Sequence, residues 1–173
     1  MFEDIAQKIR NVPDFPKPGI MFKDITTLIK DGEAFRRVID FFYETFKEAG
    51  INYVAAVESR GYLFGAPLAY KLGAGLVIIR KPGKLPAEVE REEYSLEYGA
   101  DALEIHKDAI EKGKKVLLID DLLATGGTVA ASCRLVQKLG GEIAACAFVI
   151  ELADLNGRRN LPKEVPVVCM LSC

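Results

Sequence analysis

The sequence predicts an α/β protein with an open, mostly parallel β-sheet flanked by helices. Short, apolar, β-branched runs alternate with helix-like segments, which is the pattern of strands joined by helical crossovers. The chain has 173 residues, about the size of one domain, and half of them are hydrophobic, enough for one core. No linker-like stretch divides it, so we expect a single domain over residues 1–173.

The first clear element is a helix predicted over residues 32–49. Its apolar residues recur at helical spacing and form one stripe: Phe35, Val38, Ile39, Phe42 and Phe46. Asp31 is placed to cap the start of this helix, and Gly50 is placed to end it.

The remaining elements alternate between strand and helix. Strands are expected over residues 51–57, 76–79, 115–119 and 143–150, because these runs are short and apolar. Helices are expected over residues 62–72, ended by Gly73, and 128–139, ended by Gly140 and Gly141. Open sheets of this kind bind ligands at the carboxyl ends of their strands, so the residues that follow each strand are the candidates for function.

Residues 81–100 depart from this alternation. Two prolines, two glycines and many charged residues replace the core periodicity. Connections of this length are commonly lids or binding loops, and a surface hairpin is the alternative.

The strongest functional signal follows the strand predicted at 115–119. Asp120 and Asp121 stand at its end, and a small-residue loop then leads into a helix: Ala124, Thr125, Gly126, Gly127 and Thr128. Glycines let backbone N–H groups approach an anion, and the helix N-terminus adds partial positive charge, so the loop predicts a phosphate site. The carboxylates suit the vicinal hydroxyls of a sugar, and ribose 5-phosphate fits both halves. A plain strand–turn–helix with a capping aspartate is the alternative.

Cations follow two other predicted strands. Arg60 comes shortly after the strand that ends at Val57, where its guanidinium could fork onto phosphate oxygens. Arg80, Lys81 and Lys84 follow the strand that ends at Ile79 and could neutralise a pyrophosphate. The alternatives are a surface salt bridge for Arg60 and an ordinary solvated surface for the other three.

Five blocks of the sequence resemble, in order and spacing, those of the type I phosphoribosyltransferases, and within them the branch that acts on adenine. They are PDFPKPGIMFKDIT (13–26), ESRGYLFG (58–65), RKPGKLP (80–86), YSLEYG (94–99) and DDLLATGGT (120–128). The resemblance covers nearly the whole chain, and it implies the type I phosphoribosyltransferase fold with a flexible hood loop.

The resemblance also implies roles for individual residues. Those expected to bind pyrophosphate are Ser59, Arg60, Arg80, Lys81 and Lys84, the first two often through a cis peptide. Those expected to bind adenine are Ile20, Met21, Phe22, Lys23 and Leu152, although Lys23 stands where many relatives have Arg. Glu97 would handle the proton of the base and Tyr98 would help to close the loop.

By this resemblance, the chain is expected to make AMP and pyrophosphate from adenine and 5-phosphoribosyl 1-pyrophosphate in purine salvage. Mg²⁺ is expected as cofactor, held mainly by substrate and water, and Arg80 is expected to reach across the interface of a homodimer. Ala124 stands where enzymes for hypoxanthine and guanine typically have Asp, which argues against those bases. A xanthine phosphoribosyltransferase and a non-catalytic regulator that senses the sugar pyrophosphate are the alternatives.

Composition excludes several other classes. The net charge is −2, and no apolar run approaches the roughly 20 residues that cross a bilayer, so neither a nucleic-acid nor a membrane partner is expected. The charged N-terminus lacks a signal-peptide pattern, and we expect a cytoplasmic protein whose four cysteines are free and buried. His106, the only histidine, is expected to be structural.

Overall fold

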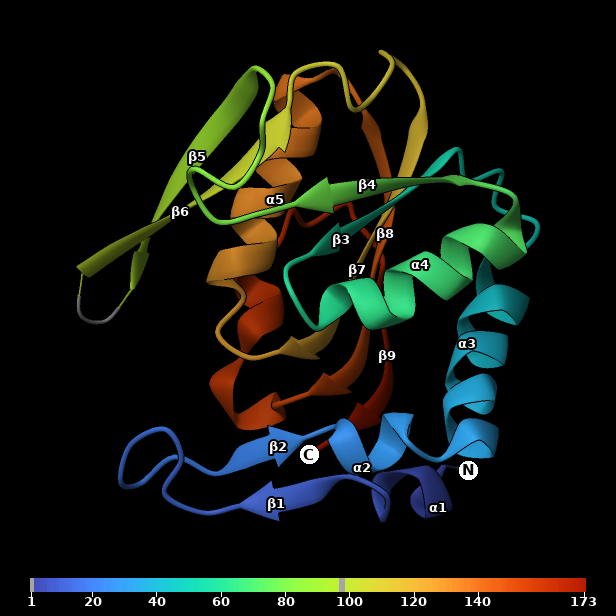
Figure 1. The fold of residues 1–173 in the computed structure, drawn as a ribbon, viewed down its shortest axis with the longest axis vertical. Helices are drawn as coiled ribbons and strands as arrows, with labels where there is room; N and C mark the ends of the chain where they lie inside the picture. Colours follow the sequence, from blue (N-terminus) through green and yellow to red (C-terminus); the bar gives the residue numbers. More distant parts are fainter. Residues whose placement is uncertain (1, 97–98) are drawn as a thin grey trace. The chain divides into compact units, whose positions relative to one another are not determined.

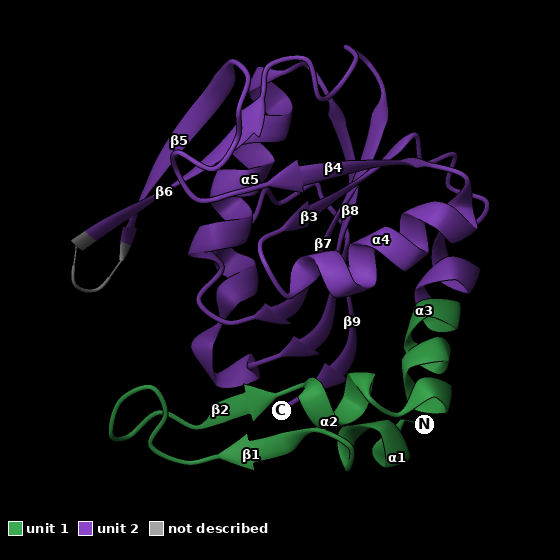
Figure 2. Cartoon of the chain, in the orientation of Figure 1, with its two compact units in different colours: residues 1–41 green, residues 42–173 purple. Residues whose placement is uncertain are grey.

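The computed structural model describes residues 2–96 and 99–173. The chain forms two compact units, residues 1–41 and residues 42–173 (Figure 2). The expectation of a single domain therefore stays a prediction, and the two units are described separately below.

The first unit contains short elements that the sequence patterns did not predict. They are helix α1 (Glu3–Ala6), strand β1 (Arg10–Val12), strand β2 (Phe22–Asp24) and helix α2 (Thr26–Ile29). β1 and β2 pair antiparallel, with Arg10 opposite Asp24, and the two side chains form an ion pair. Such short strands carry too little periodicity to be recognised from sequence.

Helix α3 (Gly32–Phe46) runs from the first unit into the second. Its predicted start is confirmed, because Asp31 Oδ1 accepts a hydrogen bond from the Ala34 N–H at 3.1 Å. Its predicted end was wrong: the helix stops at Phe46, the last residue of the apolar stripe. Gly50 instead has a positive φ of 68° in the connection to the first strand of the second unit.

The second unit is built on a five-stranded sheet (Figure 1). Its strands, in spatial order, are β4 (Gly75–Ile79), β3 (Tyr53–Val57), β7 (Lys115–Leu123), β8 (Glu142–Glu151) and β9 (Val167–Ser172). All neighbouring pairs are parallel, which confirms the predicted fold class.

Two helices cover opposite faces of this sheet, α4 (Gly61–Leu72) and α5 (Gly127–Lys138). The β3-to-β4 and β7-to-β8 crossovers run in opposite directions along the strand order, so right-handed connections place the helices on opposite faces. Ala55 and Val57 of β3 join the buried cluster that includes α5, whereas Gly65 of α4 packs on Ala56. The chain therefore reverses its direction of winding between β3 and β7.

Residues 81–100 contribute to an antiparallel hairpin, as the alternative expectation proposed. β5 (Val89–Leu96) pairs with β6 (Gly99–His106), and the hairpin lies along α5 (Figure 1). Its role as a lid stays a prediction.

Two further differences concern the sheet itself. β7 continues to Leu123, past the expected end at Ile119, because its pairing with β8 extends to Glu151. Asp120 and Asp121 therefore lie inside the strand and not after it. β9 was not predicted, although its apolar run, VVCMLS, is typical of a buried strand.

Two short 3₁₀ helices, η1 (Ala153–Leu155) and η2 (Gly157–Asn160), connect β8 to β9. The four cysteines are free. Cys133 and Cys146 are buried as expected, but Cys169 is half-buried and Cys173 is exposed, so burial was wrong for these two. Within the described residues, we find no helix with the length and apolar character needed to span a membrane.

Candidate active site

A cleft of about 280 Å³ opens where β3 and β7 end. This is the point at which the chain reverses its winding, where open parallel sheets bind their ligands. Residues from three separate parts of the sequence line it: Val57, Glu58, Ser59, Arg60, Lys81, Asp120, Asp121, Leu122, Ala124 and Thr128. The fold thus brings together the paired acids, both ends of the small-residue loop and two of the predicted cations.

Of the paired acids in this cleft, Asp121 is buried and Asp120 is half-buried. The Asp121 side chain is 4% exposed, and its Oδ2 lies 3.0 Å from Nε of Arg60. Burial, together with the charge of Asp121, raises the pKa of Asp120 well above its usual range. Burial also raises the pKa of Asp121, against the opposing charge of Arg60. A ligand whose hydroxyls donate to these carboxylates would relieve part of this cost.

The loop after β7 is held by backbone-to-backbone packing. Gly126 is the N-cap of α5 and has a φ of 84°, a conformation that glycine adopts at little cost. A Cβ at Gly126 would lie 2.3 Å from the carbonyl oxygen of Gly157, and a Cβ at Gly157 would lie 2.2 Å from that of Ala124. The Asn160 side chain donates to the Thr125 carbonyl at 2.6 Å. η2 therefore sets the path of the loop.

Cations at the edge of the cleft are paired with a carboxylate from the end of β3. Glu58, whose side chain is 7% exposed, accepts from Arg80 Nε at 2.8 Å and from Lys84 Nζ at 2.5 Å. Burial works to raise the pKa of Glu58, but the bonds from Lys84 and Arg80 outweigh burial and lower it. The peptide between Glu58 and Ser59 is cis. The resemblance implied a cis peptide at Ser59 and Arg60 without naming Glu58. Lys81 forms an ion pair with Asp101 of β6.

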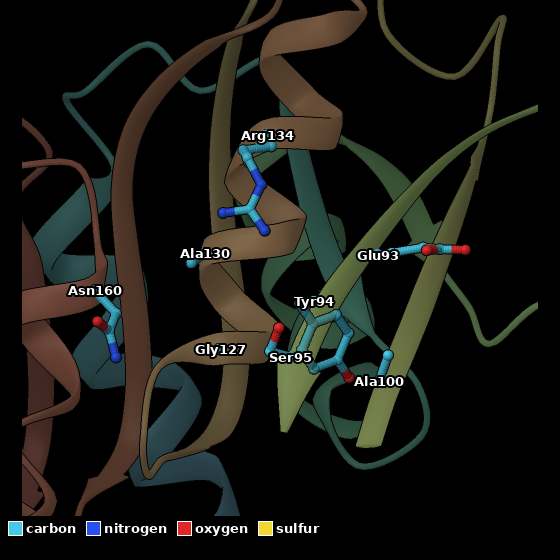
Figure 3. A pocket seen from close by; sticks show the side chains of 8 residues that line it. All are labelled: Glu93, Tyr94, Ser95, Ala100, Gly127, Ala130, Arg134 and Asn160. Carbon is cyan, nitrogen blue, oxygen red and sulfur yellow. The ribbon is translucent and has the colours of Figure 1, made fainter. Parts of the chain in front are cut away.

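A second, larger pocket of about 490 Å³ lies between the hairpin and α5 (Figure 3). β5 contributes Glu93, Tyr94 and Ser95, β6 contributes Ala100, α5 contributes Gly127, Ala130 and Arg134, and η2 contributes Asn160. Gly127 is therefore placed beside this pocket, and not in the lining of the cleft.

The predicted adenine-binding residues fall into different units. Ile20 and Met21 are exposed, and Phe22 and Lys23 belong to β2, where Lys23 Nζ donates to Asn11 Oδ1 at 2.9 Å. Leu152 follows β8 in the second unit, and its N–H donates to the Leu123 carbonyl at 2.9 Å. Their joint role in base binding stays a prediction.

Glu97 and Tyr98, predicted to handle the proton and to close the loop, lie outside the described residues. Sequence reasoning missed Glu58, which lines the cleft. It also missed four residues outside the lining that contact the loop of residues 124–128 or Lys81, namely Tyr94, Asp101, Gly157 and Asn160. The only signal for Glu58 was its position directly after a strand. The other four depend on contacts with residues distant in sequence, which no local pattern reveals.

Among residues 2–96 and 99–173, no group of three or more His, Cys, Asp or Glu side chains is arranged to hold a metal ion. His106 accepts a hydrogen bond from the Ala87 N–H at 3.3 Å, in line with a structural role.

Comparison with known proteins agrees with this geometry. The model of the "Phosphoribosyl transferase domain" family matches residues 26–172. The chain is 59% identical over 169 residues to the adenine phosphoribosyltransferase of Chloroflexus aurantiacus, covering 98% of this chain and 97% of that protein.

Solved structures give the same result. The adenine phosphoribosyltransferase of Thermoanaerobacter pseudethanolicus superposes with a TM-score of 0.97 at 50% identity, covering all of both chains. The enzyme of Saccharomyces cerevisiae, complexed with an imino-altritol bisphosphate and adenine, has a TM-score of 0.92 at 40% identity and 97% coverage of each chain. The chain belongs to the phosphoribosyltransferase family, and within it to the adenine phosphoribosyltransferases.

Proposed function

We propose that this protein transfers the phosphoribosyl group of 5-phosphoribosyl 1-pyrophosphate to adenine, giving AMP and pyrophosphate for purine salvage. The observation that carries the proposal is that the paired acids, both ends of the small-residue loop, Arg60 and Lys81 line one cleft. In the reaction, the bond between sugar C1 and pyrophosphate breaks, a bond from adenine N9 to C1 forms, and N9 loses its proton.

The loop of residues 124–128 binds the 5-phosphate in this proposal. Its backbone N–H groups and the N-terminus of α5 supply the donors, with the hydroxyls of Thr125 and Thr128. Asp120 and Asp121 accept hydrogen bonds from the ribose hydroxyls and hold the sugar still.

The leaving pyrophosphate is bound by Ser59, Arg60, Arg80, Lys81 and Lys84. The charges of the two arginines and two lysines stabilise the negative charge that develops as the C1–oxygen bond breaks, and Ser59 adds a hydroxyl donor. Three of these cations are already oriented by a carboxylate, Arg60 by Asp121 and Arg80 and Lys84 by Glu58. When pyrophosphate binds, its oxygens replace these carboxylates as partners of the cations.

Mg²⁺ fits the donors that this site would offer. Mg²⁺ prefers oxygen ligands and commonly keeps several waters while binding substrate phosphates. We place it on the pyrophosphate oxygens and water, where it would neutralise charge on the leaving group. In this proposal Asp120 and Asp121 bind the ribose hydroxyls and do not bind the metal ion.

The base is handled by the remaining predicted residues. Glu97 accepts the N9 proton, and Tyr98 helps the hairpin to exclude water. Ile20, Met21, Phe22, Lys23 and Leu152 are each proposed to contact adenine.

We also propose a homodimer. In this chain Arg80 pairs with Glu58 at its own cleft, and its expected reach across a dimer interface stays a prediction. Large apolar side chains of α4 and of the edge strand β4 are exposed, namely Leu63, Tyr70, Leu76 and Ile78, which supports a partner surface there. Light scattering coupled to size exclusion tests this. We place the protein in the cytoplasm, in keeping with its free thiols.

The decisive assay follows radiolabelled adenine into AMP with 5-phosphoribosyl 1-pyrophosphate and Mg²⁺, in parallel with hypoxanthine, guanine and xanthine. We expect turnover with adenine alone, and preference for a 6-oxopurine would overturn the proposal. Glu97→Gln is expected to slow turnover strongly, while normal turnover would remove Glu97 from the mechanism without affecting the binding assignments.

A further inference from the structure

One hydrogen-bonded cluster connects the hairpin to the cleft. It consists of Lys81, Tyr94 of β5, Asp101 of β6 and Thr128 of α5, and we call it the hairpin clasp. The Tyr94 hydroxyl lies 3.2 Å from Lys81 Nζ, 3.2 Å from Asp101 Oδ2 and 3.4 Å from Thr128 Oγ1. A hydroxyl has one proton and two acceptor sites, so Tyr94 can accept from Lys81 and Thr128 while it donates to Asp101.

The clasp is packed as well as hydrogen-bonded. Tyr94 is 7% exposed, and its ring lies beside Gly127 at the start of α5 (Figure 3), where a Cβ on Gly127 would be 3.4 Å from Cδ2. Lys81 Nζ lies 5.7 Å from the centre of the same ring, within the range of a cation–π contact. Tyr94 and Asp101 are direct cross-strand partners, so the register of the hairpin places them together.

Only two members of the clasp reach the cleft. Lys81 and Thr128 line it, whereas Tyr94 and Asp101 do not. Lys81 belongs to the proposed pyrophosphate site and Thr128 to the proposed 5-phosphate site. The Tyr94 hydroxyl, which lies outside the cleft lining, is hydrogen-bonded to both and so connects the two anion sites.

The electrostatics of Lys81 suit this arrangement. Burial disfavours its charge, but the hydrogen bonds to Asp101 and Tyr94 outweigh burial and raise the pKa of Lys81. The Lys81 ammonium in turn lowers the pKa of Asp101. The ammonium has three donors, and two are used by Asp101 and Tyr94, which leaves one for a substrate oxygen.

We propose that Tyr94 and Asp101 are positioning residues for 5-phosphoribosyl 1-pyrophosphate. They hold Lys81 and Thr128 in one fixed relation, so that the two anionic ends of this substrate meet contacts that are already ordered. Lysine has a long flexible stem, and ordering it before binding saves conformational entropy that the substrate would otherwise have to offset. This inference rests on the proposed function, and it gives a positioning role to two residues that do not contact the substrate.

The test uses Tyr94→Phe and Asp101→Asn in the full chain, with binding measured by calorimetry in the presence of Mg²⁺. We expect the Kd for 5-phosphoribosyl 1-pyrophosphate to rise about three- to tenfold in each variant, the effect of losing a bond to a charged group at a partly exposed site. Asp101→Asn acts through Lys81, so the Kd for AMP, which lacks the pyrophosphate, should change by less than about twofold. The two substitutions together should cost less than the product of the single effects, because both act on one cluster.

Glu88→Gln is the matched control. Glu88 pairs with Lys107 at 3.3 Å at the open end of the same hairpin, and both side chains are exposed. Its Kd values should match those of the unmodified protein.

Three results would overturn the inference. They are an unchanged Kd for 5-phosphoribosyl 1-pyrophosphate in both variants, an equal loss of affinity for AMP in Asp101→Asn, and tighter binding in Asp101→Asn. The second would indicate a general structural defect, and the third would mean that Asp101 competes with the substrate for Lys81. If the unmodified protein fails to convert adenine, the proposed function fails instead, so the two failures are distinguishable.

Discussion

The loop of residues 124–128 and the cations Arg60, Arg80, Lys81 and Lys84 are both assigned to anionic groups of one substrate, yet they are built differently. The loop contains no charged residue, and its shape comes from glycine and from backbone packing against η2. Each of the cations is instead paired with a carboxylate: Arg60 with Asp121, Arg80 and Lys84 with Glu58, and Lys81 with Asp101.

This difference predicts different sensitivity to substitution. A backbone site depends on the path of the chain, so one added carbon can displace several donors together. In a site of paired cations, one substitution frees only the cations that its carboxylate orients. Each substitution therefore lowers the affinity for substrate by a smaller amount.

The largest effect is expected for Gly126→Ala in the loop. The new Cβ would lie 2.3 Å from the Gly157 carbonyl oxygen at a φ of 84°, so the loop must shift. We expect kcat/KM to fall about a hundredfold or more and the free energy of unfolding to fall by about 2–4 kcal/mol. Steady-state kinetics and urea denaturation measure both.

Gly113→Ala is the control for this change, because Gly113 has a φ of 80° and a Cβ there would meet no other atom within 4 Å. It should cost about 1 kcal/mol of stability and leave activity intact. Equal losses of activity in the two variants would show that the backbone path of the loop is not what binding requires.

The second effect concerns the acids beside the loop. Asp120→Asn should lower kcat/KM about ten- to a hundredfold, because ribose hydroxyls lose a charged acceptor. The same change should stabilise the fold at neutral pH by about 1–3 kcal/mol. The folded-state pKa of Asp120 is raised, so the protonated carboxyl favours the fold at low pH and this contribution is lost as pH rises through the folded pKa.

The stability difference between Asp120→Asn and the unmodified protein should therefore grow as pH rises from about 4, where unfolded aspartate ionises. Urea denaturation between acid and neutral pH measures it. Asp108→Asn, in an exposed turn, is the control and should show neither effect. A stability gain that is the same at every pH would contradict the argument.

A smaller effect, with the opposite pH dependence, is expected for Glu58→Gln at the cation site. Burial opposes the Glu58 charge, but Lys84 and Arg80 outweigh it and lower the folded-state pKa. The ionised Glu58 therefore adds to the free energy of unfolding above the pKa of glutamate in the unfolded chain. This addition is lost as the pH falls through the pKa of Glu58 in the folded protein. We expect a loss of about 1 kcal/mol at neutral pH that disappears below about pH 4, and a rise of about three- to tenfold in KM for 5-phosphoribosyl 1-pyrophosphate.

The same denaturation series measures this change. If Glu58→Gln and Asp120→Asn shift stability in the same direction as pH rises, the contrast between the two sites is wrong.

The smallest effect is expected for Asn160→Ala. This change removes one hydrogen bond, 2.6 Å long, to the Thr125 carbonyl but leaves the packing of Gly126 on Gly157. We expect KM for 5-phosphoribosyl 1-pyrophosphate to rise about two- to fivefold, in line with about 1 kcal/mol for one hydrogen bond. Arg159→Ala, an exposed neighbour, is the control. A hundredfold loss in Asn160→Ala would mean that the side chain, and not the backbone packing, sets the loop.

Prediction from sequence succeeded where structure is local and periodic. β3, α4, β8 and α5 were located to within a few residues, because buried strands and helix ends have strong composition signals. β5 and β6 were not located as strands, because their polar residues mask the alternation. Between Asp120 and Thr128, four predicted residues line the cleft, Asp120, Asp121, Ala124 and Thr128, whereas Leu122 lines it without having been predicted.

The sequence by itself determined the strand, turn and helix that carry the paired acids and the small-residue loop, since these depend on neighbours a few positions apart. Only the tertiary structure decided which carboxylate holds each cation and which backbone supports the loop. Arg80 meets Glu58 across 22 positions, Lys81 meets Asp101 across 20, and Asn160 meets Thr125 across 35. Such partners are chosen by strand order, hairpin register and packing, which involve the whole second unit at once.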